Sequence, residues 1–139
     1  MMASPVGQSL ADAAQALVGS GFRLHGRHPV TGLDCVGVLS AALTAIGRKA
    51  ALPDAYRLRS RAIPDLSRIA ADCGMVAVID ALQAGDVLLA KIGSCQFHVL
   101  ITAENGCVVH AHAGLGRVII EPISDDWQIA GHWRLIPTN

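Results

Sequence analysis

The chain has 139 residues, enough for one hydrophobic core and too few for two, so we expect a single domain over residues 1–139. Lys and Arg together number 11, as do Asp and Glu, so no overall charge attracts the protein to nucleic acid or to an anionic membrane surface. Apolar residues make up 52 % of the chain, but no apolar run reaches the roughly 18 residues of a membrane helix. We therefore expect a packed globular protein with no nucleic-acid partner and no membrane insertion.

The first residues do not have the pattern of a secretion signal. Met1-Met2-Ala3-Ser4-Pro5 lacks a basic start and a continuous apolar core, so we expect synthesis in the cytoplasm. The four cysteines show no Cys-x-x-Cys spacing. A reducing compartment then favours free thiols over two disulfides.

The spacing of apolar residues predicts a first helix over about 4–18. Ser4 is placed to cap it, Pro5 takes the first helical position, and Gly19 ends it. A loop rich in Gly and His covers 21–29 and leads to a second predicted helix. The apolar positions of that helix repeat with helical spacing at Val36, Leu39, Leu43 and Ile46.

Cys35 falls at the N-terminus of the second predicted helix. Unpaired backbone N–H groups and the helix dipole favour a thiolate there, so we expect a lowered pKa for Cys35 and an N–H group able to bind an oxyanion. The alternative is that Cys35 is a small buried apolar residue, which is the usual role of an arbitrary cysteine.

Residues 51–75 are predicted to form a mixed connection with a short helix over 64–73. The basic residues of this stretch are interpreted as a solvated face rather than a binding patch; they are Arg57, Arg59, Arg61 and Arg68. After Met75 the pattern changes to short strands separated by Gly or Pro signals, over 76–79, 87–92, 97–103, 107–112, 117–121 and 132–136. Short links between successive strands predict an antiparallel sheet, so the class is α+β, with N-terminal helices packed on a C-terminal sheet of five or six strands.

Two histidines, His98 and His110, lie on strands joined by a hairpin at Asn105-Gly106. A two-residue turn would place them on opposite faces of the sheet, whereas a three-residue loop over 104–106 with Gly106 in the left-handed region places them on the same face. In the second register His112 lies directly opposite His98, and His110 lies diagonally from it. A catalytic interpretation requires this register, and strand geometry alone does not choose between His110 and His112.

The ordered set of motifs resembles the NlpC-type papain-like cysteine peptidases of bacterial peptidoglycan, over about 21–136. The segments that carry the resemblance are Phe22-Arg23-Leu24-His25-Gly26, Asp34-Cys35-Val36-Gly37, Gly85-Asp86, His98-Val99-Leu100-Ile101 and His110-Ala111. The separation of twelve positions between His98 and His110 is similar to that of the family's base and third residue, which favours His110 over His112. The resemblance implies a papain-like fold with the nucleophile at a helix N-terminus.

The resemblance further implies a hydrolase of peptidoglycan stem peptides that needs no cofactor and no metal. Cys35 would attack the carbonyl, His98 would act as base and then acid, and His110 would orient His98. The cleaved bond in such enzymes joins γ-D-glutamate to a diamino acid.

On the substrate side the resemblance points to Asp34, Phe22 and His25. Phe22 stands where the family usually has a tyrosine, and His25 or His28 in the same loop is a candidate for the missing polar group. Leu100 replaces the usual glycine after Val99. Helix capping explains Asp34 as well as substrate binding does, and Asp86 is interpreted as a turn residue.

Two other functions remain open from the sequence. One is a catalytically weak or inactive tail-tip module that keeps the fold. The other is a zinc site built from Cys35, His98, His110 or His112, for which the closely spaced ligand pairs are missing. The ending of the chain, with Glu121-Pro122, Trp127 and Trp133-Arg134, looks like the short branch encoded with phage tails and gene transfer agents. That branch would have phage-like tail proteins as partners, and the tail particle would carry the protein to the cell-wall compartment.

Overall fold

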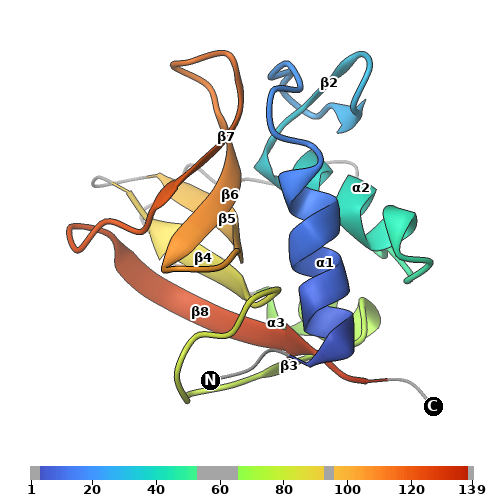
Figure 1. The fold of residues 1–139 in the computed structure, drawn as a ribbon, viewed down its shortest axis with the longest axis vertical. Helices are drawn as coiled ribbons and strands as arrows, with labels where there is room; N and C mark the ends of the chain where they lie inside the picture. Colours follow the sequence, from blue (N-terminus) through green and yellow to red (C-terminus); the bar gives the residue numbers. More distant parts are fainter. Residues whose placement is uncertain (1–3, 53–65, 93–95, 138–139) are drawn as a thin grey trace.

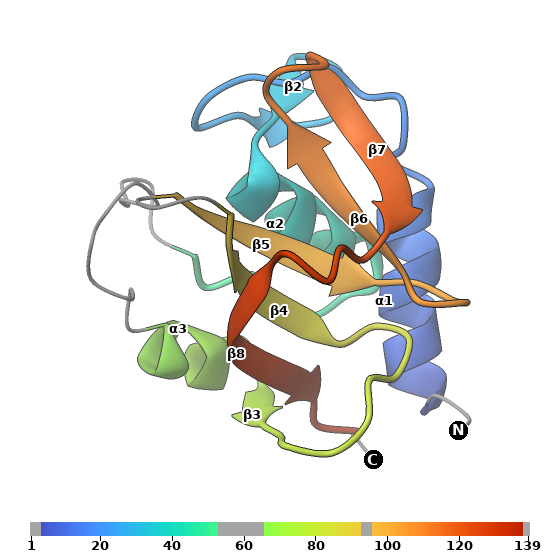
Figure 2. The same ribbon diagram turned by 90° about the vertical axis from the view of Figure 1, so that its left-hand side faces the viewer.

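The computed structural model describes residues 4–52, 66–92 and 96–137. Within them, helices α1 (Pro5–Gln15), α2 (Cys35–Ala45) and α3 (Ser67–Asp72) accompany a six-stranded antiparallel sheet. Figures 1 and 2 show α1 and α2 side by side against one face of the sheet. The predicted α+β class is confirmed, and the three described helices precede all strands of the six-stranded sheet as predicted.

The sheet has the strand order β3-β8-β4-β5-β6-β7. Its strands are β3 (Met75–Ala77), β4 (Val87–Lys91), β5 (Phe97–Thr102), β6 (Cys107–His112), β7 (Arg117–Pro122) and β8 (Gln128–Leu135). Strands β4 to β7 form a meander, whereas β8 returns to lie between β3 and β4. Strand β8 begins four residues before the predicted start, because its first residues are largely exposed and show no apolar alternation.

The capping residues explain where the first two helices begin. Ser4 Oγ accepts a hydrogen bond from Gly7 N at 3.1 Å, and Pro5 opens α1. At α2, Asp34 Oδ1 accepts from Gly37 N at 2.8 Å. Helix α1 ends at Gln15, earlier than predicted, because residues 16–19 form a turn that reaches Gly19 at φ 96°.

A short two-stranded ribbon that the sequence did not predict precedes α2. Strands β1 (Arg27–His28) and β2 (Gly32–Leu33) pair antiparallel. The loop that carries them lies beside the β6–β7 turn, where Phe22 N donates to Gly116 O at 2.9 Å (Figure 2). A backbone hydrogen bond thus joins this loop to the β6–β7 hairpin, which contains His110.

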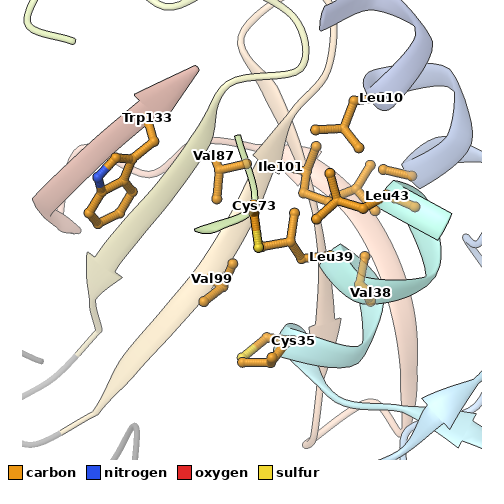
Figure 3. Packing of buried hydrophobic residues seen from close by; sticks show 14 of the residues in the cluster. Leu10, Cys35, Val38, Leu39, Leu43, Cys73, Val87, Val99, Ile101 and Trp133 are labelled. Atoms are coloured by element: carbon orange, nitrogen blue, oxygen red, sulfur yellow. The ribbon is translucent and has the colours of Figure 1, made fainter. Parts of the chain in front are cut away.

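The two faces of the sheet bury different clusters. The helix side forms the main core, which includes Leu10 of α1, Leu39 of α2 and Val99 of β5 (Figure 3). The other face carries a smaller cluster made of Leu88, Ala90, Leu100 and Val108, with Ile92, Ile123 and Trp127 packed against it.

Several residues named from the sequence fall at or beyond the edges of the described segments. Arg57, Arg59 and Arg61 lie outside the described residues, as does Cys95, and α3 is shorter than the predicted helix. Cys35, Cys73 and Cys107 are free thiols. Among the described helices, none combines the length and apolarity needed to cross a membrane.

A contact between backbones at the start of α1 generates a stability prediction. Gly85 has φ +87°, and a Cβ there would lie 2.0 Å from Gly7 O, so Gly85→Ala must displace α1. Gly106 has φ +70°, but a Cβ there would meet nothing within 4 Å, so Gly106→Ala should cost only the left-handed strain of roughly 1–2 kcal/mol. Urea unfolding should show a clearly larger loss for Gly85→Ala, and equal losses would contradict this packing.

Candidate active site

The hairpin between β5 and β6 has the register that the catalytic interpretation requires. Ile101 pairs with Val109 and Thr102 with Val108, so residues 104–106 form a three-residue connection. Cys107 N donates to Glu104 O, while Ala103 N donates to Cys107 O, which leaves Glu104 as one extra residue in its strand. Both Asn105 (φ 59°) and Gly106 (φ 70°) are left-handed. The prediction that His98 and His110 share a face is confirmed.

The two imidazoles contact each other on that face. The ring centroids of His98 and His110 are 5.9 Å apart with an interplanar angle of 77°, an edge-to-face contact. His112 lies 5.9 Å from His110, and the Trp127 ring covers His110 at 5.8 Å. His110 is therefore the central ring of the group, with only 2 % of its surface exposed.

The hydrogen bonds of the two rings lead away from each other. His110 Nε2 lies 2.5 Å from Glu121 Oε2, and His98 Nε2 lies 3.1 Å from Gln96 Nε2. The Nδ1 atoms of both rings are buried without a hydrogen-bond partner. His98 and His110 are thus in ring contact without the hydrogen bond expected between a base and its orienting residue.

Cys35 lies at the first position of α2 and is 7 % exposed. Its thiol is close enough to the Val99 backbone N–H for that group to act on its pKa. Thr102 N donates to Asp86 O, on the β4 side of β5. Because backbone N–H groups alternate in direction along a strand, the Val99 N–H points to the β6 side. The pairing of β5 with β6 is limited to Ile101 and Thr102, so it does not include Val99. The thiol therefore sits where these strands separate, next to the residue that follows His98 (Figure 3).

The Cys35 thiol and the two imidazoles lie on opposite faces of the sheet. Cys35 packs with Val99 in the cluster on the helix face, whereas His98 shares its face with Leu100 of the smaller cluster. Because His98 Nδ1 has no hydrogen-bond partner, the thiol does not donate to it in this structure.

The pKa of Cys35 corrects the expectation drawn from its helix position. Burial raises the pKa of Cys35 to about 12, and the nearby Asp34 carboxylate raises it further, against the opposing effect of the Val99, Val36 and Cys35 backbone N–H groups. The predicted lowering of this pKa is therefore wrong. Removal of the thiolate from water outweighs the favourable backbone groups.

Burial changes the pKa of His98 in the opposite direction. Desolvation, together with the nearby His110 and His112 rings, lowers the pKa of His98 to about 4. At neutral pH the resting site therefore contains a neutral thiol and a neutral imidazole.

The residues predicted to contact substrate surround the start of α2. Asp34 is 3 % exposed, and its second carboxylate oxygen accepts from His25 N at 2.8 Å. His25 has φ 62°, and the half-buried Phe22 packs against the main core. Asp34 thus caps α2, as the capping interpretation predicted, and it also holds the loop of His25 to the helix, which the sequence did not predict.

Asp86 belongs to a buried ion-pair network away from Cys35. Its carboxylate accepts from His132 Nε2 at 2.6 Å and from Arg134 Nε at 2.8 Å, and Arg134 also contacts Asp80. No sequence pattern connects His132 and Arg134 with Asp86, because β8 is more than 40 positions further along the chain. The Gly-Asp motif therefore has a structural explanation.

Sequence reasoning also missed Glu121, Gln96 and Trp127 as neighbours of the histidines. In the β6–β7 pairing Glu121 lies opposite Val108, which puts it on the face of His110. Only this register could have identified it. Among residues 4–52, 66–92 and 96–137, no three His, Cys, Asp or Glu side chains group as a metal site, so the zinc alternative gains no support.

No family model and no curated protein matches the sequence. Solved structures do resemble the fold. NlpC1 from Trichomonas vaginalis matches with a TM-score of 0.68 and 19 % identity over 96 % of this chain and 47 % of that one, so this chain spans about half its length. The NlpC/p60 domain of the peptidoglycan hydrolase SagA matches with a TM-score of 0.53 and 21 % identity, over 84 % of this chain and 88 % of that one.

A third similar structure is RipD from Mycobacterium tuberculosis, described as a non-catalytic NlpC/p60 domain protein adapted to peptidoglycan binding. It matches with a TM-score of 0.61 and 16 % identity over 96 % of this chain and 100 % of that one. These similarities establish the NlpC/p60 papain-like fold. They include proteins with and without catalytic activity.

The His98 environment generates a pH prediction. Because the pKa of folded His98 is about 4 and its ordinary value is 6.5, the unfolded chain binds more protons between these values. The contribution of His98 to the free energy of unfolding should therefore be fully present above pH 6.5 and should be lost as the pH falls toward about 4. Urea unfolding at several pH values should show a weaker acid dependence for His98→Gln than for the wild type.

The matched control is His28→Gln, a substitution of an exposed histidine at the end of β1. It should keep the acid dependence of the wild type. An unchanged dependence in His98→Gln would contradict the effect of burial on His98.

Proposed function

We propose that the protein is a cysteine peptidase that hydrolyses the stem peptides of peptidoglycan. The observation that carries the proposal is the position of the Cys35 thiol beside the Val99 N–H, next along β5 to His98, whose ring contacts His110. We propose that Cys35 acts as the nucleophile, His98 as the base and His110 as the polar partner of the base.

The chemistry follows from these three residues. The Cys35 sulfur attacks the peptide carbonyl as its proton passes to His98, which makes a tetrahedral oxyanion and an imidazolium. His98 then returns the proton to the leaving amine, and the acyl group stays on sulfur. Water, deprotonated by His98, attacks the thioester and releases the carboxylate and the free thiol.

Backbone N–H groups supply the stabilisation of the oxyanion. The N–H groups of Cys35 and Val36 lie at the N-terminus of α2, where helix geometry leaves them without carbonyl partners. We propose that the Cys35 N–H binds the oxyanion, an interaction worth roughly 3–4 kcal/mol in comparable sites.

The neutral resting pair implies that substrate must help to assemble the reactive state. Moving a proton from a thiol with a pKa of about 12 to an imidazole with a pKa of about 4 is strongly unfavourable in the structure as it stands. Proton transfer therefore accompanies carbonyl attack, when the negative charge moves from sulfur to an oxygen held by N–H groups. A shift of His98 toward the thiol would give its unpartnered Nδ1 a hydrogen bond.

The substrate class rests on the fold and on the loop in front of α2. SagA, which has this fold, is described as a peptidoglycan hydrolase. We propose that Phe22, His25 and Asp34 form the substrate side of the site and that the cleaved bond joins γ-D-glutamate to a diamino acid. Phe22 supplies an apolar ring, and the exposed His25 side chain supplies a polar group at the rim.

A non-catalytic peptidoglycan-binding module is the second candidate function. The buried neutral thiol and the missing hydrogen bond between Cys35 and His98 favour it. RipD, which is described as such a module, shares the fold.

We also propose that a phage-like tail delivers the protein to the cell wall. The motivation is the resemblance of the segment around Glu121, Trp127 and Trp133 to the short branch encoded with phage tails. Mass spectrometry of purified tail particles from the producing cells should detect the protein in particle fractions. Its confinement to the soluble cell fraction would contradict this delivery.

Replacement of the nucleophile tests the peptidase proposal. Cys35→Ala should abolish the release of stem-peptide fragments from purified sacculi, because no other group forms the acyl intermediate. Products from defined muropeptides, identified by mass, should show cleavage after γ-D-glutamate.

Cys107→Ser provides the matched control, since Cys107 is a free thiol at the start of β6, beside the β5–β6 turn. It should retain turnover. Turnover by Cys35→Ala would refute the mechanism, whereas a wild-type protein that sediments with sacculi but releases no fragments would establish the binding module instead.

A further inference from the structure

We propose that Glu121 is a positioning residue that holds His110 as the tautomer protonated on Nε2, so that His110 Nδ1 accepts a hydrogen bond from His98 during catalysis. The proposal rests on the proposed peptidase function and extends it by a fourth side chain. The structure shows the contacts of His98 with His110 and of His110 with Glu121, and the proposed mechanism adds Cys35 at the other end of the series.

The contact between Glu121 and His110 fixes the position of one proton. Glu121 Oε2 lies 2.5 Å from His110 Nε2. A carboxylate only accepts hydrogen bonds, so the ring nitrogen that faces it must carry the proton. In neutral His110 this leaves Nδ1 as an acceptor.

The surroundings of His110 keep this arrangement rigid. Strands β6 and β7 pair over six residue pairs, from Cys107↔Pro122 to His112↔Arg117, which fixes the backbone of Glu121 relative to that of His110. The Trp127 ring packs edge-to-face on His110. With 2 % exposure, His110 has almost no access to water that could serve Nδ1 in place of a protein group.

His110 Nδ1 is an acceptor without a donor in this structure. A buried acceptor without a partner is destabilising, so His110 Nδ1 gains a hydrogen bond if a donor comes near. The His98 ring, 5.9 Å away between centroids, is the adjacent imidazole, and it gains a second N–H when it takes the proton of Cys35. His110 then accepts from the His98 imidazolium, and the Glu121 carboxylate balances the positive charge.

Loss of Glu121 frees His110 to protonate on Nδ1 instead. In that tautomer the His110 nitrogen facing His98 is a hydrogen-bond donor. The His98 imidazolium can only donate, so this form of His110 cannot stabilise it. The step that suffers is the chemical one, because substrate binding does not involve Glu121.

The first measurement is the tautomer of His110, read from the ¹⁵N chemical shifts of its ring nitrogens in the whole protein. We expect a protonated Nε2 and an unprotonated Nδ1 in the wild type. Glu121→Leu should give a mixture of tautomers or the Nδ1-protonated form. An Nδ1-protonated His110 in the wild type, or an unchanged Nε2-protonated form in Glu121→Leu, would overturn the proposal.

The second measurement is turnover of a defined muropeptide. Glu121→Leu should lower kcat by about tenfold or more with KM little changed, as expected for loss of a residue that sets an imidazole tautomer. Glu121→Gln keeps a hydrogen-bond acceptor without the charge and should lie between Glu121→Leu and the wild type. If the wild type turns over the muropeptide and Glu121→Leu has the same kcat, the catalytic part of the proposal is overturned.

The control is Glu104→Gln, which alters an exposed glutamate in the β5–β6 turn and should change neither measurement. Circular dichroism checks that each variant is folded, and Glu121→Gln serves if Glu121→Leu does not fold. If the wild type itself releases no fragments, the proposed peptidase function fails, and the ¹⁵N measurement still decides whether Glu121 sets the His110 tautomer.

Discussion

The carboxylate of Asp34 is the constraint on which the candidate site depends. One oxygen accepts from Gly37 N inside the first turn of α2, and the other accepts from His25 N in the preceding loop. The same region brings two backbones together so closely that a Cβ on Gly37 would lie 2.0 Å from Gly26 O. Gly37 is therefore needed for the contact of α2 with the Gly26 backbone, and that contact helps to hold the start of α2, which carries Cys35.

Holding Cys35 in this way also buries it, and burial has two opposite consequences for the chemistry. It removes the thiolate from water, which raises the pKa of Cys35, and it lowers the pKa of His98 across the strand. The same exclusion of water strengthens each backbone N–H that faces a developing charge. A site of this kind is inert at rest and depends on the substrate carbonyl to receive the charge.

The sequence predicted the parts of the fold that local rules determine. Capping by Ser4 and Asp34 and the N-terminal position of Cys35 follow from short-range patterns. The turn signal at Asn105-Gly106 located the hairpin but allowed two registers, and only the catalytic interpretation favoured the three-residue connection that the structure has. The raised pKa of Cys35 could not be predicted, because it depends on burial by the whole core. The contacts of Glu121 with His110 and of Asp86 with His132 and Arg134 depend on strand order and register, which no local pattern contains.

The place of β8 between β3 and β4 has a consequence for the order of folding. The meander from β4 to β7 joins neighbours in the chain, so its hairpins close short loops at little entropic cost. Strand β8 must instead pair Trp133 with Val87 and with Ala77, over far greater separations. We expect the half of the sheet that carries His98 and His110 to assemble first and β8 to dock later. Its docking brings His132 and Arg134 onto the buried Asp86 carboxylate, so the ion-pair network completes the sheet rather than nucleating it.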